Sequence, residues 1–221
     1  EASGHVETFT DPLVECKTCH ERFRTDHTDQ IKEHGEWHRK KEESVVWAEA
    51  RTFNLLFRTF VGSVEDSASQ TYLRPETAQG MFVNFKNILD TTRRKLPFGI
   101  AQIGKAFRNE ITPRDFLFRS REFEQMEIEY FIREAEWSAH FDYWLCEMRT
   151  WIRDVGIDAE HIHEFEVSEK DRAHYSKRTV DFEYDFPFGK KELYGISYRT
   201  NFDLKNHFKE APYKDNESGE A

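Results

Sequence analysis

The sequence predicts an α+β fold in which an antiparallel β-sheet is flanked by helices. Residues 119–130 and 179–186 alternate between apolar and charged side chains, as strands with two different faces do. Between them, residues 134–155 carry apolar side chains at helical spacing, and Gly156 follows as a stop. The sequence has no Gly-rich phosphate loop and no parallel βαβ rhythm. We therefore favour an antiparallel sheet with helices packed behind it.

The strand predicted at residues 119–130 has an apolar and a polar face. The apolar face, which we expect to lie in the core, carries Met126, Ile128 and Tyr130. The polar face carries Arg119, Arg121, Phe123, Gln125, Glu127 and Glu129. Residues 100–111 also look extended, and Pro113 and Asp115 supply turn chemistry between the two runs. An antiparallel hairpin follows, with Arg108, Arg114, Arg119 and Arg121 placed to surround a polyphosphate.

The spacing on the polar face suits an extended ligand. At about 3.3 Å per residue, Phe123 and Glu127 lie roughly 13 Å apart, which approaches the length of an aminoacyl-adenylate laid along a strand. A nucleotide at one end and an amino acid at the other would fit. The alternation alone is equally compatible with a solvent-exposed face of an antiparallel sheet, so the choice depends on the exact residues.

Those residues resemble a known family. The run FRNE at 107–110, a loop, and the run RxxxF at 119–123 are similar to motif 2 of class II aminoacyl-tRNA synthetases. The runs RPETAQ at 74–79 and FEQME at 123–127 narrow the resemblance to the glycyl-tRNA synthetase family. Further similar runs lie at residues 2–6, 173–181 and 199–204. Because the resemblance is spread over most of the chain, it implies the class II catalytic core.

The resemblance implies an ATP site in which Arg108 and Arg119 are catalytic. Arg108 would clamp the α-phosphate and the substrate carboxylate with a bidentate fork that lysine lacks, and Arg119 would bind the outer phosphates. Glu110 would hold the adenine end, and Phe123 would stack on the base. The full set of ATP-binding positions implied is Arg108, Asn109, Glu110, Phe118, Arg119, Ser120, Arg121, Glu122, Phe123, Glu192 and Leu193. Glu192 is also the candidate Mg²⁺ ligand, and its alternative is an exposed strand carboxylate beside two lysines.

The same resemblance implies a glycine pocket. Glu76 and Glu127 would receive the glycine ammonium through charge-assisted hydrogen bonds, and Gln125 would line the pocket. The implied glycine-binding positions are Glu76, Phe123, Glu124, Gln125, Met126 and Glu127. Because a missing methyl group changes binding by only about 1–3 kcal/mol, we expect the pocket to exclude alanine by crowding the α-carbon.

The implied reaction has two steps. The glycine carboxylate attacks the α-phosphate of Mg²⁺-bound ATP and releases pyrophosphate, and the 3′-terminal ribose of tRNA(Gly) then takes the glycyl group. No protein nucleophile is needed, because positioning and charge neutralisation carry the catalysis. The implied enzyme is a cytoplasmic homodimer in its intact form. The rival interpretations are a non-catalytic accessory subunit in nucleic-acid processing and a zinc-binding interaction module.

Cys16 and Cys19 form the second chemical candidate, because two thiolates three residues apart are a common half of a tetrahedral zinc site. The remaining ligands could come from His20, His27, His34 and His38, or from a segment that the chain lacks between Asp29 and Val45. The alternative is a pair of reduced surface thiols. The third cysteine, Cys146, falls inside the predicted helix.

Length and charge set further limits. The chain has 221 residues, enough for one large domain, and its net charge of −10 argues against bulk affinity for nucleic acid. An odd count of three cysteines and the lack of a signal or membrane segment favour a cytosolic protein with no membrane association. We expect a single but incomplete catalytic-core domain over 1–221, with an insertion or mobile loop at 28–43, the motif-2-like hairpin at 71–132 and a frayed tail at 209–221. The family's first motif, third motif and anticodon-binding domain have no counterpart here, so we expect a fragment of a longer protein.

Overall fold

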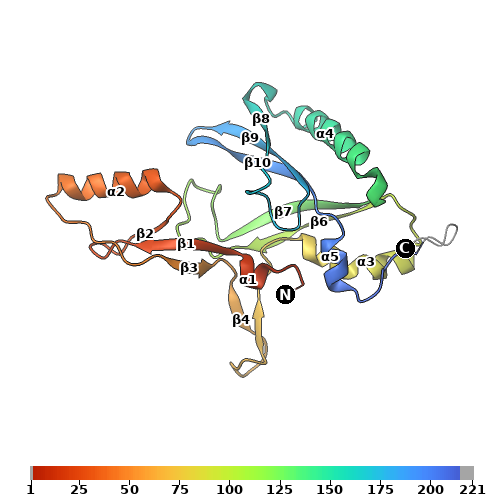
Figure 1. Cartoon of the computed structure of the whole chain (residues 1–221), viewed down its shortest axis with the longest axis horizontal. Coiled ribbons are helices and arrows are strands. Elements are labelled where there is room, and N and C mark those ends of the chain that lie inside the picture. Colours follow the sequence, from red (N-terminus) through yellow and green to blue (C-terminus); the bar gives the residue numbers. More distant parts are fainter. Residues whose placement is uncertain (1, 215–221) are drawn as a thin grey trace. The chain divides into compact units, whose positions relative to one another are not determined.

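The computed structural model describes residues 2–214, which divide into two compact units (Figure 1). Unit 1 contains residues Ser3–Thr77 and Ile103–Met126. Unit 2 contains Ala2, Ala78–Gln102 and, within the described part of the chain, residues 127–214. The expectation of a single catalytic-core domain over the whole chain stays a prediction.

The centre of unit 1 is a three-stranded antiparallel sheet in the order β2-β1-β3. Strand β1 (Thr10–Glu15) pairs with β2 (Arg22–Arg24) on one side and with β3 (Arg51–Asn54) on the other. Leu13 and Val14 of β1 are buried, as is Cys16 directly after it. The short helix α1 (His5–Thr8) precedes this sheet, and a second antiparallel pair, β4 (Arg58–Phe60) with β5 (Gln70–Tyr72), follows it.

Residues 28–43, expected to form an insertion or mobile loop, contain helix α2 (Thr28–Lys40). Figure 1 shows α2 beside the β2-β1-β3 sheet. Its two buried side chains are His34 and His38 rather than aliphatic residues. A helix whose buried positions are polar has no apolar stripe, so the hydropathy pattern does not reveal it. Whether the segment is an insertion stays a prediction.

Strands β6 (Phe98–Phe107) and β7 (Glu122–Phe131) are hydrogen-bonded neighbours, as the predicted hairpin requires. Each strand begins in one unit and ends in the other. The prediction that the apolar face of β7 lies in the core is wrong, because Met126 and Ile128 are 55% and 52% exposed. The polar face, which carries Phe123 and Gln125, is the part-buried one. Alternation shows which residues share a face, but not which face a two-stranded ribbon leaves uncovered.

Unit 2 contains the antiparallel sheet β10-β9-β8, formed by β8 (Ile162–Glu166), β9 (Arg178–Phe186) and β10 (Gly189–Tyr198). Helix α4 (Trp137–Asp154) packs on it through Phe141, Leu145 and Ile152, which join Val180 and Phe182 in one buried cluster. The amphipathic helix predicted at residues 134–155 is thus confirmed, with a short 3₁₀ turn, η1 (Glu134–Glu136), at its start. A second 3₁₀ turn, η2 (Ala159–His161), leads into β8.

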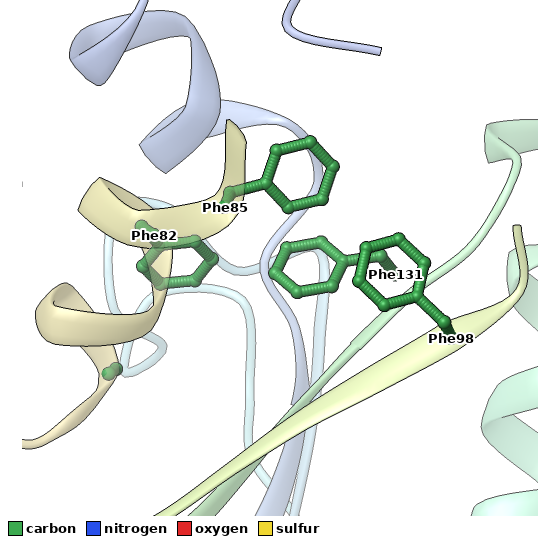
Figure 2. Packing of buried hydrophobic residues seen from close by; sticks show 5 residues of the cluster. Phe82, Phe85, Phe98 and Phe131 are labelled. Atoms are coloured by element: carbon green, nitrogen blue, oxygen red, sulfur yellow. The ribbon is translucent and has the colours of Figure 1, made fainter. Parts of the chain in front are cut away.

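A separate phenylalanine cluster forms the other core of unit 2 (Figure 2). Phe82 and Phe85 come from α3 (Ala78–Thr92), whereas Phe98 begins β6 and Phe131 ends β7. The rings of Phe85 and Phe131 lie 4.6 Å apart between centroids, and Phe85 is only 1% exposed. Aromatic rings at such separations contribute packing energy beyond the area that they bury.

Helix α5 (Phe202–His207) and the start of the predicted tail also belong to unit 2. Leu204 and Tyr213 pack against the phenylalanine cluster. Residues 209–214 contain no helix or strand, and the rest of the predicted tail, 215–221, lies outside the described residues. Among residues 2–214, no helix has the length and apolar character needed to cross a membrane. The observed helices and antiparallel sheets confirm the predicted α+β class.

Candidate active site

The predicted site residues are distributed over both units. Unit 1 holds Glu76, Arg108, Asn109, Glu110, Phe118, Arg119, Ser120, Arg121, Glu122, Phe123, Glu124, Gln125 and Met126. Unit 2 holds Glu127, Glu192 and Leu193. The geometry of each unit is therefore described separately.

In unit 1, Arg108 is held between two aromatic rings directly after β6 ends. Its guanidinium carbon lies 5.2 Å from the ring centroid of Phe123 and 5.6 Å from that of Phe9. The Nε atom donates to the carbonyl of Pro75 at 3.1 Å, and the backbone N–H donates to the carbonyl of Arg121 at 2.9 Å. Two rings and one backbone acceptor orient the planar fork, which is what bidentate recognition of an anion requires.

Glu110 and Arg119 form an ion pair beside this arginine. Arg119 Nη1 lies 3.1 Å from Glu110 Oε2, and Arg121 Nε donates to the Glu110 carbonyl at 3.2 Å. Reciprocal backbone hydrogen bonds between Arg114 and Arg119 close the loop that joins these two residues. The loop thus brings arginines and a carboxylate together at one place in unit 1, as the predicted ATP site needs.

Asp11 on β1 extends this group of charges, and sequence reasoning missed it. Burial raises the pKa of its carboxyl, and Arg24 at 3.0 Å opposes that shift. Glu110 also raises this pKa, whereas Arg119 lowers it. A lone aspartate beside Pro12 in a strand offers no sequence signal of this role, because only the folded sheet brings Asp11 near the loop.

Glu76 follows Pro75, the backbone acceptor of Arg108, and is only 7% exposed. Its carboxylate lies 3.7 Å from His5 Nε2, and His5 Nδ1 lies 2.7 Å from Ser3 Oγ. Gln125 accepts a hydrogen bond from the backbone N–H of Thr77 at 3.3 Å. A nearly buried carboxylate beside a histidine ring is suited to receive an ammonium group.

The remaining predicted residues of unit 1 lie near the loop or on the exposed face of β7. Ser120 Oγ donates to the Glu122 carbonyl at 3.1 Å, and the Glu122 carboxylate pairs with Lys105. Glu124 and Met126 lie on the exposed face of β7, opposite Phe123 and Gln125.

The loop tip itself is exposed. Phe116 is 91% exposed, and both Asp115 and Phe116 adopt positive φ. The predicted turn chemistry of Asp115 agrees with this conformation, because aspartate tolerates the left-handed region better than most residues. Phe118 lies in the same loop and is 37% exposed.

In unit 2, three carboxylates share one face of the β9–β10 ribbon. Glu192 stands directly opposite Glu183, and the strand register shifts between Glu192 and Tyr194, at Leu193. Burial, and then the charges of Glu192 and Glu183, raises the pKa of Asp181 to about 6. A Cβ on Gly195 would lie 2.8 Å from Asp181 Oδ1. The Asp181 carboxylate can therefore lie this close to β10 only because residue 195 has no side chain. A bound divalent cation would offset the repulsion among these three carboxylates, because such cations prefer carboxylate oxygens as ligands.

A second network in unit 2 uses residues from the resembling runs at 74–79 and 199–204. Gln79 Nε2 donates to Asp203 Oδ1 at 2.9 Å, and Arg199 holds Asp203 through both carboxylate oxygens. Asp203 is 1% exposed, and His207 Nε2 lies 3.0 Å from Gln79 Oε1. The Arg199 guanidinium also lies 3.8 Å from the ring centroid of Tyr175. The i, i+4 spacing of Arg199 and Asp203 was the available sequence signal for this pair.

The structure brings Cys16 and Cys19 together with His34 and His38 in unit 1. The alternative of two surface thiols is wrong for Cys16, which is fully buried. Among the four candidate histidines, His20 points instead to Glu15 at 3.2 Å and is exposed, and His27 lies outside the cluster. Cys146 is exposed on α4, in the helix predicted for it.

Comparisons with known proteins agree with the resemblance seen in the sequence. Residues 60–220 match the model of the tRNA synthetase class II core domain (G, H, P, S and T). The chain is 47% identical over 233 residues to a glycine–tRNA ligase of Alkaliphilus oremlandii (strain OhILAs), covering 94% of this chain and 50% of the relative. It is 46% identical over 246 residues to that of Geobacillus thermodenitrificans (strain NG80-2), covering 100% of this chain and 53% of the relative. The chain spans about half the length of the curated relatives it matches. Because the family model covers most of its residues, the chain belongs to the class II tRNA synthetase core-domain family.

Proposed function

We propose that the protein containing this chain is a glycine–tRNA ligase. It activates glycine with ATP to glycyl-adenylate and then transfers the glycyl group to the 3′ end of tRNA(Gly). The observation that carries the proposal is the 46–48% identity to proteins named glycine–tRNA ligase across 93–100% of this chain. The chemistry of the candidate site supports it independently.

Arg108 is the proposed clamp for the α-phosphate, where the glycine carboxylate attacks in line. The rings of Phe9 and Phe123 restrict its guanidinium, so little reorientation is needed when charge moves onto the phosphate oxygens. Arg119 is the proposed partner of the outer phosphates and the departing pyrophosphate. Its ion pair with Glu110 holds it in place before substrate arrives, at 3.1 Å.

Adenine recognition is proposed for Phe123 and Glu110. Phe123 offers a part-buried ring on the polar face of β7, and base–aromatic stacking contributes about 1–3 kcal/mol. Asn109, Phe118, Ser120, Arg121, Glu122 and Leu193 are the further proposed ATP contacts. Glu192, beside Asp181, is the proposed holder of Mg²⁺, which when bound supplies positive charge against the phosphates.

Glycine recognition is proposed for Glu76 and Glu127, with Gln125 beside the pocket. Glu76 is nearly buried, so a carboxylate there is strongly stabilised by a charged hydrogen-bond partner such as the glycine ammonium. Phe123, Glu124 and Met126 are the further proposed glycine contacts. We expect carboxylates packed around the ammonium group to leave no room for the methyl group of alanine.

The proposed partners and setting follow from the same activity. The partners are glycine, ATP and tRNA(Gly), and the intact protein is proposed to be a cytoplasmic homodimer. The net charge of −10 makes a broad electrostatic tRNA surface on this chain unfavourable, so the contact would be a local basic patch or a part outside this chain.

ATP–pyrophosphate exchange tests the proposal. The full-length protein is assayed with each proteinogenic amino acid in turn, and exchange with glycine alone is expected. Exchange with a different amino acid instead would show that this amino acid, and not glycine, is the substrate. No exchange with any of them would reject the ligase and favour a non-catalytic accessory subunit.

A further inference from the structure

Four potential metal ligands converge between the β1–β2 turn and α2. Cys16 and Cys19 lie in the turn, and His34 and His38 lie one helical turn apart on α2. Cys16 Sγ lies 3.7 Å from His38 Nε2, and Cys19 Sγ lies 3.4 Å from His34 Nε2. All four ligand atoms lie within 4.8 Å of one another.

We propose that these four side chains bind one structural Zn²⁺ ion. Tetrahedral zinc with Zn–S of about 2.3 Å and Zn–N of about 2.0–2.1 Å separates sulfur from nitrogen by roughly 3.6 Å. The two sulfur–nitrogen distances in the cluster, 3.4 and 3.7 Å, lie on either side of that value. Cys-x₂-Cys followed by His-x₃-His is also a ligand spacing that zinc sites use.

Each histidine is oriented by a carboxylate on its other ring nitrogen. His38 Nδ1 lies 2.7 Å from Glu43 Oε2, and His34 Nδ1 lies 3.2 Å from Glu21 Oε2. A carboxylate that accepts from Nδ1 leaves the Nε2 lone pair directed at the thiols, as in the carboxylate–histidine–zinc arrangement. A simple Cys–His hydrogen-bonded cluster would not need both imidazoles to be held in this way.

The backbone of the turn fixes the position of Cys16 relative to Cys19. The N–H of His20 donates to the Cys16 carbonyl at 2.7 Å, and the N–H of Cys16 donates to the Glu21 carbonyl at 2.9 Å.

The enclosure of the cluster makes the proposed site structural rather than catalytic. Cys16, His38 and His34 are 0%, 1% and 8% exposed. The rings of Phe23 and Trp47 pack against His34 at 4.7 and 5.6 Å. Four protein ligands leave no open coordination position for a substrate. Because α2 buries only its two histidines, the bound metal would supply the attachment between this helix and β1 that an apolar stripe normally supplies.

Metal analysis with matched variants tests the proposal. The full-length protein is purified without a metal-affinity tag, and its zinc is measured by elemental analysis, with about one ion per chain expected. Cys16→Ser and Cys19→Ser should lose the zinc. Cys146→Ser and His20→Asn should keep it, because these controls remove the exposed cysteine and the exposed neighbouring histidine outside the cluster.

Cobalt substitution keeps the proposal testable even where a ligand variant fails to fold. The wild-type protein is stripped with a chelator and titrated with Co²⁺, and we expect the absorption bands of tetrahedral cobalt with thiolate charge transfer. Zinc-free protein that also lacks these bands would overturn the proposal, as would zinc retained in both cysteine variants. The result is independent of glycine-dependent exchange, so failure of either experiment leaves the other interpretable.

Discussion

At the scale of single residues, the candidate site depends on how side chains are oriented rather than on which types are present. Arg108 has its fork directed by two rings and the Pro75 carbonyl. Glu76 combines burial with a nearby histidine. These arrangements restrict the side chains before any substrate binds, which is what the proposed site, with no protein nucleophile, would need.

The roles proposed for Phe123 and Glu127 predict opposite kinetic effects. Phe123→Ala should raise the KM for ATP about 5- to 100-fold, because a stacking surface worth about 1–3 kcal/mol is lost. Glu127→Gln should raise the KM for glycine about 10-fold or more, because a charge-assisted hydrogen bond is lost. Both are measured by ATP–pyrophosphate exchange in the full-length protein.

The control for these variants is Glu147→Gln, which removes an exposed carboxylate from α4 and should change neither constant. Equal effects of Phe123→Ala on the two KM values would argue against separate nucleotide and amino-acid roles.

At the scale of elements, stability depends on a few buried faces. The phenylalanine cluster joins α3 to the ends of β6 and β7 (Figure 2), and the buried cluster around Phe141 joins α4 to β9. Charged pairs on the surface add smaller contributions. Arg149 of α4 holds Glu164 of β8 through both carboxylate oxygens, at 2.5 and 2.7 Å. These two kinds of contact predict stability losses of different size and different pH dependence.

Removing one ring from the phenylalanine cluster should be strongly destabilising. Phe85→Ala deletes a side chain that is 1% exposed, and we expect the free energy of unfolding to fall by about 3–5 kcal/mol. Val83→Ala on the same helix is the control, because Val83 is 53% exposed and should cost well under about 1 kcal/mol. Urea denaturation followed by circular dichroism measures both. Similar losses in the two variants would contradict the assigned core.

The Arg149–Glu164 pair should stabilise the fold only while Glu164 is ionised. The hydrogen bond from Arg149 holds the pKa of Glu164 below its ordinary value of 4.5. The folded state therefore binds protons less readily than the unfolded state, so the contribution is present above pH 4.5 and is lost as pH falls through the lowered pKa.

Glu164→Gln should accordingly lower the free energy of unfolding by about 0.5–1 kcal/mol at pH 7, a small value because the pair is partly exposed and screened. The difference from wild type should vanish once the pH lies below the lowered pKa of Glu164. Denaturation curves across pH measure it. A difference that persists unchanged at low pH would exclude the ion pair as its cause.

At the scale of the whole chain, different structural features stabilise the two units. Unit 1 holds the sheet of β1, β2 and β3 together with the Cys16–His38 cluster, whereas unit 2 holds both large apolar clusters. The chain also spans about half of each similar ligase, and its net charge is −10. The proposed tRNA contact on this chain would therefore depend on a local basic patch rather than on the overall charge.

The α+β class, the helix at residues 134–155 and the strands predicted at 119–130 and 179–186 were accessible from the sequence, because each of these segments has an apolar period over several residues. The ATP contacts implied between Arg108 and Phe123 come from exact motifs whose residues lie close together in the chain, and their role stays a prediction. Helix α2 could not be predicted from the hydropathy pattern, because its buried side chains are His34 and His38. The sequence also could not show which face of β7 is covered, because alternation carries no information about what packs on each side.

The sequence by itself therefore determined the α+β class and, through its motifs, the family to which the chain belongs. Only the tertiary structure decided which histidines join Cys16 and Cys19, that Asp11 lies beside Glu110 and Arg119, and that Asp181 shares a face with Glu183 and Glu192. The physical reason is the sequence separation over which each kind of signal acts. Periodicity and motifs report on neighbours a few residues apart, whereas a metal site or a charge cluster depends on side chains that approach only after strands pair and helices pack.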